Sequence, residues 1–251
     1  MKTKLFLFAV LTASLFACRK ENLRNPVLDC IGDVESTFIS TGFCDPDNIP
    51  YFLCEVEDFG EIVLAEESKT FLPQYCEDIG SVLIFENATG EEITYRISSK
   101  DYTPLGIIYN KFESCPGDTT KFIGACLSTE ALSITLDADD SWSQFIIRLN
   151  PQLDRSFDGS YGDFLSINNR IDSTAWGTTF EVIINQRNLD RAETANQEFY
   201  PNIQLNEEIY QNVYSHDLIH PLWESYKFYY TKNEGLIGFE DLDDVLWTLK
   251  E

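Results

Sequence analysis

The chain has 251 residues, of which 43% are hydrophobic and 14% aromatic, a composition typical of a folded protein rather than a disordered one. Its 42 acidic residues against 18 Lys and Arg give a formal net charge of −24, which repels phosphate backbones and argues against nucleic-acid binding. No apolar run reaches the roughly 18 residues that a membrane-spanning helix needs, so we expect no transmembrane helix.

The first 17 residues have the pattern of a secretory signal peptide. Lys2 and Lys4 precede an apolar run from Leu5 to Phe16, which is the order of a charged segment followed by a short hydrophobic one. A buried core helix at the N-terminus is the alternative interpretation. Export predicts that the rest of the chain folds in an oxidising compartment, where disulfide bonds form.

The sequence Leu-Phe-Ala-Cys that ends at Cys18 resembles a bacterial lipobox, although Phe16 departs from the usual small or β-branched residue at that place. The resemblance implies that the chain is cut before Cys18 and that acyl chains are attached to the sulfur and the new amino group of this residue. Two or three acyl chains anchor a protein stably to a membrane. We therefore expect a lipidated tether over residues 18–27 and a single β-rich domain over residues 28–251.

Six further cysteines remain once Cys18 is assigned to lipid. An even number in an exported chain predicts disulfide bonds, and six cysteines allow 15 pairings. We expect Cys115 to pair with Cys126, because Pro116, Gly117 and Asp118 form a turn signal that could bring the flanking segments together. A zinc site is the rival interpretation, but the cysteines are too far apart in sequence for the usual ligand pairs. The six candidates are Cys30, Cys44, Cys54, Cys76, Cys115 and Cys126.

Alternation of apolar and polar residues, interrupted by turn residues, predicts antiparallel strands along most of the chain. The clearest signal is a hairpin in which residues 81–86 and 92–98 flank the turn Asn-Ala-Thr-Gly at 87–90. Further strands are expected at 61–65, 106–110, 132–137, 144–149, 180–184, 203–206, 225–231, 235–240 and 245–249.

Helical signals are few and short. They fall at residues 72–76, 188–198 and 216–223, and Pro221 interrupts the last. The sequence therefore predicts an all-β fold, a single domain of about ten mostly antiparallel strands with short helices. A sheet of this size has to curl to hide its apolar face and its edges, so we expect a curved sheet, half-barrel or barrel-like sandwich.

The sequence offers little catalytic chemistry. His216 and His220 are spaced so that they would share one face of a helix, but the Glu of a metalloprotease helix is missing and Pro221 follows at once. No Gly-x-Ser-x-Gly elbow, Gly-rich phosphate loop or dinucleotide fingerprint is present. We therefore expect no enzyme activity, no cofactor and no metal site. The two histidines are the weak candidates for a metal.

An aromatic stripe of Tyr226, Phe228 and Tyr230 alternates along one predicted strand. Such a stripe can be part of a packed core, or it can line a cavity for a small apolar ligand inside a curved sheet. The sequence leaves both interpretations open.

Several stretches resemble uncharacterised lipoproteins of Bacteroidota. The resemblance implies an outer-membrane anchor, with the domain facing the periplasm or the cell surface. It also implies O-glycosylation of Thr119 and Ser173, since Asp-Thr-Thr and Asp-Ser-Thr resemble the modification sites of that phylum. The glycines at 235 and 238 are similar to those of lipoprotein-carrier half-barrels. The matching stretches are EIVL at 61–64, FLPQY at 71–75, LIFEN at 83–87, YQNVY at 210–214, YYTKNEGLIGF at 229–239 and LWTL at 246–249.

These patterns favour a lipid-anchored envelope protein that acts as a non-catalytic binding or interaction module. The expected partners are the membrane, through acyl chains on Cys18, and an unknown protein, a glycan or a small apolar ligand. A scaffolding lipoprotein without a pocket is the alternative. A metal-dependent hydrolase that uses His216 and His220 is a third hypothesis.

Overall fold

The computed structural model describes residues 51–139, 143–153, 159–170, 176–189, 197–216 and 226–250. Several predicted features lie outside these residues, and the structure does not bear on them. They are the signal peptide, the tether, most of the helix at 188–198, and residues Cys18, Cys30, Cys44, Ser173 and His220.

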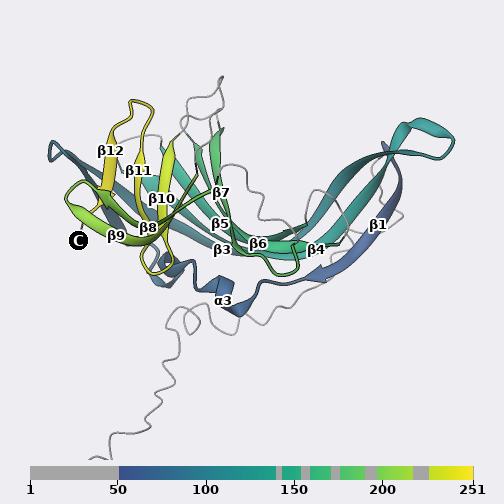
Figure 1. The fold of residues 1–251 in the computed structure, drawn as a ribbon, viewed down its shortest axis with the longest axis horizontal. Helices are drawn as coiled ribbons and strands as arrows, with labels where there is room; N and C mark the ends of the chain where they lie inside the picture. Colours follow the sequence, from purple (N-terminus) through teal and green to yellow (C-terminus); the bar gives the residue numbers. More distant parts are fainter. Residues whose placement is uncertain are drawn as a thin grey trace, which may run out of the picture.

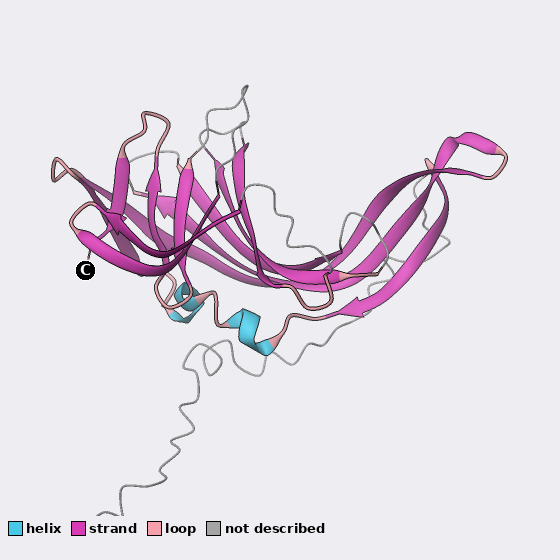
Figure 2. Ribbon diagram, viewed as in Figure 1, coloured by secondary structure: helices cyan, strands magenta, loops and turns pink. Residues whose placement is uncertain are grey.

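All twelve described strands belong to one sheet, which confirms the all-β prediction (Figure 2). Two short helices, α3 (Glu66–Lys69) and η2 (Pro73–Cys76), follow the first strand, and η2 lies where the first helical signal was found. The strands are β1 (Leu53–Ile62), β2 (Val82–Asn87), β3 (Glu92–Cys115), β4 (Asp118–Ala138), β5 (Gln144–Leu153), β6 (Tyr161–Arg170), β7 (Trp176–Asn185), β8 (Gln197–Leu205), β9 (Glu208–His216), β10 (Lys227–Thr231), β11 (Gly235–Glu240) and β12 (Leu246–Leu249).

The sheet curls until it nearly closes into a barrel (Figure 1). Its strand order is β7-β6-β5-β4-β3-β2-β12-β11-β10-β9-β8, with antiparallel neighbours throughout, and β1 pairs in parallel with β4 off this path. The two ends of the order approach each other, because β7 lies beside β9. Edge strand β8 carries Pro201, a residue that sheets tolerate at their edges.

The predicted hairpin is confirmed as β2 and β3, which pair from Val82 opposite Arg96 to Glu86 opposite Glu92. The side chain of Asn87 holds the turn, because its Oδ1 accepts the backbone N–H groups of Thr89 and Glu91, each at 3.0 Å. This local bonding explains why the turn signal could be read from the sequence.

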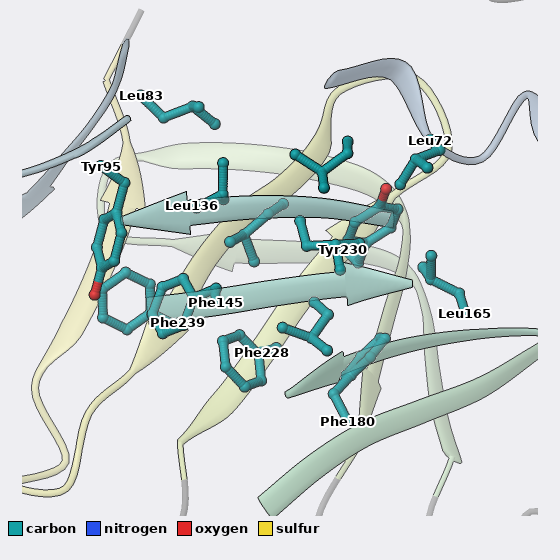
Figure 3. Packing of buried hydrophobic residues seen from close by; sticks show 14 of the residues in the cluster. Leu72, Leu83, Tyr95, Leu136, Phe145, Leu165, Phe180, Phe228, Tyr230 and Phe239 are labelled. Carbon is teal, nitrogen blue, oxygen red and sulfur yellow. The ribbon is translucent and has the colours of Figure 1, made fainter. Parts of the chain in front are cut away.

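A packed aromatic core fills the barrel interior (Figure 3). The ring of Phe145 stacks on Tyr95 with 4.4 Å between centroids, and it meets Phe228 and Phe239 edge-on at 5.2 and 5.1 Å. None of these four side chains is more than 1% exposed. Rings at these distances add stabilisation beyond that of buried area, so the core both fills and fixes the barrel.

Strands β3 and β4 continue well past the barrel and, with β1, form an arm (Figure 1). We use this name for β1 and for residues 105–115 and 118–129. Exposed acidic residues line β1, and such charges discourage pairing with other chains at a sheet edge. They are Glu55, Glu57, Asp58 and Glu61.

The disulfide bond of the arm corrects the predicted pairing. Cys115 is bonded to Cys54 of β1, with 6.3 Å between their Cα atoms, and not to Cys126. The turn at 116–118 does join β3 to β4, but the register places Cys126 opposite Ile108, seven residues along the strand from Cys115. That offset separates the two thiols by roughly 23 Å. Cys76 and Cys126 each take part in a further disulfide bond.

Other element predictions need correction as well. Residues 92–98 and 106–110 belong to one strand, β3, and the predicted strand at 61–65 ends at Ile62. Strands β6 and β9 were not predicted, and His216 ends β9 where a helix at 216–223 was expected to begin.

A cap segment, residues 63–77 with α3 and η2, lies along one side of the sheet (Figure 2). Leu64 and Leu72 of this segment are buried in the core. Its backbone is held by buried carboxylates, since Glu130 accepts the N–H of Leu64 at 2.8 Å and Asp163 accepts that of Ala65 at 3.1 Å. These bonds satisfy backbone donors that the core would otherwise leave unpaired.

The hairpin of β8 and β9 covers the outer face of the C-terminal strands. Tyr229 and Ile237 point away from the barrel interior and pack against Leu205 and Val213 of this hairpin. Asn212 has a φ of +53°, a left-handed conformation that Asn tolerates better than most residues, within β9. Strands β10 and β11 are therefore buried on both faces.

Candidate binding site

A hollow of about 780 Å³ lies where three elements meet: the β8–β9 hairpin, the turn between β10 and β11, and the cap segment. It is open to solvent, and its volume falls within the range of small-molecule sites. Its lining comprises Phe71, Phe199, Glu208, Ile209, Tyr210, Gln211, Asn212, Tyr214, Thr231, Lys232, Asn233 and Glu234.

Three aromatic rings form a continuous wall of the hollow. Tyr214 is in the middle, with its ring centroid 5.8 Å from that of Phe71 and 5.2 Å from that of Phe199, both in edge-on geometry. Phe199 is 49% exposed, and Ile209 nearby is 71% exposed. Such exposure of large apolar side chains leaves contact area that a ligand could cover.

Polar side chains form the rest of the lining. Gln211 and Asn212 come from β9, and Asn233 comes from the turn between β10 and β11; all three are exposed. The carboxylate of Glu208 accepts a hydrogen bond from the Tyr210 hydroxyl at 2.5 Å. The hollow thus combines an aromatic wall with amide groups that can both donate and accept hydrogen bonds.

Lys232 is the only cation among the described lining residues, and it already has an aromatic partner. The Nζ atom of Lys232 lies 5.1 Å from the centroid of the Phe71 ring, which is cation–π geometry. Two acidic residues, Glu208 and Glu234, also line the hollow. The local charge therefore matches the negative charge of the whole chain.

The cap segment fixes the turn that borders the hollow. Gln74 donates from Nε2 to the backbone carbonyl of Glu234 at 2.5 Å, and the Tyr230 hydroxyl donates to the carbonyl of Phe71 at 2.5 Å. Gly235 has a φ of +78°, and a Cβ atom there would lie 1.8 Å from the Gln74 side chain. Only glycine fits this position, because any larger residue would collide with Gln74. The two hydrogen bonds and this close approach therefore hold the turn and Phe71 of the aromatic wall in one arrangement.

Shifted pKa values near the hollow have structural causes. Burial raises the pKa of the Tyr214 hydroxyl. The pKa of Glu198 is lowered, chiefly because the Tyr200 hydroxyl donates to its carboxylate at 2.5 Å, and the Lys227 ammonium, 3.1 Å away, lowers it further. The raised pKa favours the neutral phenol of Tyr214, and the lowered pKa favours the ionised carboxylate of Glu198. Neither shift activates a nucleophile.

The structure shows where the predicted metal candidate His216 lies. Its Nδ1 atom accepts the backbone N–H of Glu181 at 3.3 Å, at the seam between β9 and β7. Over the described ranges, no group of three or more His, Cys, Asp and Glu side chains could hold a metal ion.

The aromatic stripe that the sequence left open as core or ligand lining belongs to the core, and none of its three residues is among those that line the hollow. Phe228 and Tyr230 are fully buried, and Tyr226 packs against the same cluster, with 6.1 Å between its centroid and that of Phe228. Of the two interpretations that the sequence left open, the packed core is the one that describes these rings.

Thr119, a predicted O-glycosylation site, is exposed at the start of β4, next to the turn from β3 at the tip of the arm. The neighbouring Asp118 accepts hydrogen bonds from both the backbone N–H and the hydroxyl of Thr120, at 3.0 and 2.6 Å. The hydroxyl of Thr120 is therefore engaged in the turn.

The residues of the hollow were not predicted as a site. Phe71, Phe199 and Tyr214 are far apart in sequence and meet only because β8–β9 folds back beside the cap segment. The usable signal in the sequence is the pair of tyrosines in YQNVY at 210–214.

In the part of the chain that the structure covers, no helix has the length and apolar character needed to cross a membrane. Comparisons with protein-family models, with curated proteins and with solved structures find no match to this chain. Its function therefore has to be argued from the geometry of the hollow and from the sequence motifs.

Proposed function

We propose that this protein is a non-catalytic binding module of the cell envelope, tethered by acyl chains on Cys18, and that the hollow is its binding site. The observation that carries the proposal is the aromatic wall of Phe71, Tyr214 and Phe199, one side of an open hollow of about 780 Å³. The signal peptide pattern and the lipobox-like sequence before Cys18 support the anchor.

The lining favours a neutral glycan among the three expected classes of partner. An anionic ligand would meet Glu208 and Glu234 and a chain of net charge −24. A wholly apolar ligand would bury the amides of Gln211 and Asn233 without a hydrogen-bonding partner. A sugar offers an apolar C–H face to the rings and hydroxyl groups to the amides, so it suits both parts of the lining.

Ligand-observed NMR tests this proposal on the mature chain, with maltohexaose, cellohexaose and xylohexaose as probes. Phe199→Ala should weaken binding by roughly fivefold, because it removes a half-exposed ring that the ligand would cover. Phe52→Ala is the matched control, since Phe52 is 41% exposed but precedes β1 of the arm. Absence of binding to all three probes, or equal weakening by the two variants, would contradict the glycan site.

The anchor needs a separate test. Intact-mass analysis of the native protein should show a chain that begins at Cys18 and carries two or three acyl groups. A Cys18→Ser variant should keep the fold but leave the membrane fraction. An unmodified Cys18 that is still joined to Ala17 would refute the anchor without affecting the binding site.

A scaffolding role without a ligand is the second candidate. The observation in its favour is the filled interior, in which aromatic side chains occupy the space where many β-barrels hold a ligand. This alternative predicts that Phe199→Ala has no effect on any glycan titration but weakens the capture of a protein partner.

A further inference from the structure

The seam of the barrel is closed by side chains rather than by strand pairing. Among the described strands, no backbone ladder joins β7 to β8 or β9. Instead, Gln197 accepts the N–H of Ile183 through Oε1 at 3.1 Å and donates from Nε2 to the carbonyl of the same residue at 3.4 Å. The side-chain amide therefore makes the pair of bonds that a neighbouring strand would make.

His216 makes the second contact across this seam. Its Nδ1 atom accepts the N–H of Glu181, two residues before Ile183 on β7, at 3.3 Å. Its ring also lies edge-on to Phe180, with 6.3 Å between centroids. Because Gln197 and His216 are cross-strand partners at the open end of the β8–β9 hairpin, they act on β7 together. We call these two residues the clasp.

The clasp is directly connected to the aromatic wall of the hollow. Phe199 and Tyr214 are also cross-strand partners, and each lies two residues from a clasp residue, so all four side chains project from the same face of the hairpin. The described pairing of β9 with β10 covers only Ser215 and Tyr214, at the same end of the hairpin as the clasp. The other end is attached by the packing of Leu205 and Val213 on the C-terminal strands.

We propose that Gln197 and His216 are positioning residues of the hollow: by fastening the hairpin to β7 they hold Phe199 and Tyr214 against Phe71. The contacts and the register carry this inference. It rests on the proposed function, because the hollow matters to binding only if it is the site. The clasp itself can be measured without any ligand.

Hydrogen exchange and NOE spectroscopy on the mature chain give that ligand-free measurement. In Gln197→Ala and His216→Ala, exchange of the Ile183 and Glu181 amides should accelerate roughly fivefold or more, as expected when a hydrogen bond is lost. The NOEs between the Tyr214 ring and the Phe71 ring of the cap segment should weaken in both variants.

Two further variants separate positioning from general destabilisation. His216→Asn should restore slow exchange at Glu181 and the ring NOEs, because Asn Oδ1 can accept the same N–H. Gln204→Ala should leave both readouts unchanged, since Gln204 is exposed on the same strand and donates to Asn206 of its own hairpin. If Gln197→Ala does not fold, Gln197→Glu keeps the acceptor and the size but loses the Nε2 donor, and it should show partial acceleration.

Unchanged ring NOEs in the clasp variants, or failure of His216→Asn to rescue them, would overturn the inference. With maltohexaose, cellohexaose and xylohexaose as probes, the clasp variants should lose about as much affinity as Phe199→Ala. Full affinity with an open clasp would overturn the inference and leave the proposed function intact. If the wild-type chain binds none of the probes but the NOEs respond as expected, the proposed function fails while the clasp stands.

Discussion

The buried carboxylate of Asp163 connects the barrel to the cap segment that carries Phe71. All three of its hydrogen-bond donors reach the same oxygen, Oδ2: the Ser68 hydroxyl at 2.5 Å, the Ala65 N–H at 3.1 Å and the Arg187 guanidinium at 3.5 Å. The other oxygen, Oδ1, is buried without a hydrogen-bond partner in the structure. This asymmetry predicts that Asp163→Ala and Asp163→Asn differ strongly in stability.

The magnitude follows from the partners that each variant leaves behind. Asp163→Ala leaves the buried Ser68 hydroxyl and the half-buried Ala65 N–H without a hydrogen-bond acceptor, and each costs about 1–3 kcal/mol of stability. Arg187 adds little to this loss, because its side chain is 25% exposed. The Nδ2 of Asn185 donates to the Ser68 oxygen at 3.3 Å, but as a donor it cannot replace the acceptor that the Ser68 O–H loses. We expect a loss of about 3 kcal/mol, against about 1 kcal/mol for Asp163→Asn, which keeps an acceptor at the Oδ2 position.

Urea unfolding with the disulfides intact measures both values, and hydrogen exchange at Ala65 reports on the local bond. A matched mutation, Asp58→Ala, controls for the loss of a carboxylate, since Asp58 is exposed and its Oδ1 accepts only the nearby Gly60 N–H. Equal losses for Asp163→Ala and Asp163→Asn would refute the reasoning, because they would show that the charge, and not the accepting oxygen, holds the cap segment.

Three further predictions concern other parts of the molecule. Phe145→Ala should lower the free energy of unfolding by about 3–5 kcal/mol in urea titrations, because it opens a cavity in the packed core; a loss below about 1 kcal/mol would mean that the core is loose. Replacing both Cys54 and Cys115 by Ser should cost about 4 kcal/mol, given their sequence separation of 61, with faster exchange confined to the arm; unchanged exchange there would contradict the pairing. Because folding lowers the pKa of Glu198, its ionised carboxylate stabilises the folded state at pH values above 4.5, the usual pKa of the group. This stabilisation disappears as the pH falls through the lowered pKa of the folded state. Tyr200→Phe should therefore lower the melting temperature at neutral pH and converge with wild type in acid, and a gap that persists in acid would exclude this cause.

The features that the sequence predicted are those with local causes. Leu132, Ile134 and Leu136 alternate with polar residues because one face of β4 points into the barrel, and all three are buried. The hairpin turn was predictable because the bonds of Asn87 are made within four residues.

The features that the sequence missed depend on distant contacts. Strand β6 reads as irregular because buried polar residues interrupt its alternation, among them Asp163, which serves the cap segment rather than the sheet. The hollow depends on the return of the β8–β9 hairpin to Phe71, more than 120 residues away in sequence. No local pattern encodes that approach, so its residues could be recognised only in the structure.

The filled interior also determines how a ligand could come and go. A β-barrel that stores cargo inside must open before it can load or release, and its exchange is then limited by slow motions of the protein. Here the aromatic side chains occupy the inside, and the hollow faces solvent directly. A molecule held at such an outer surface meets its site by simple collision, which suits rapid sampling of the surroundings better than long-term carriage.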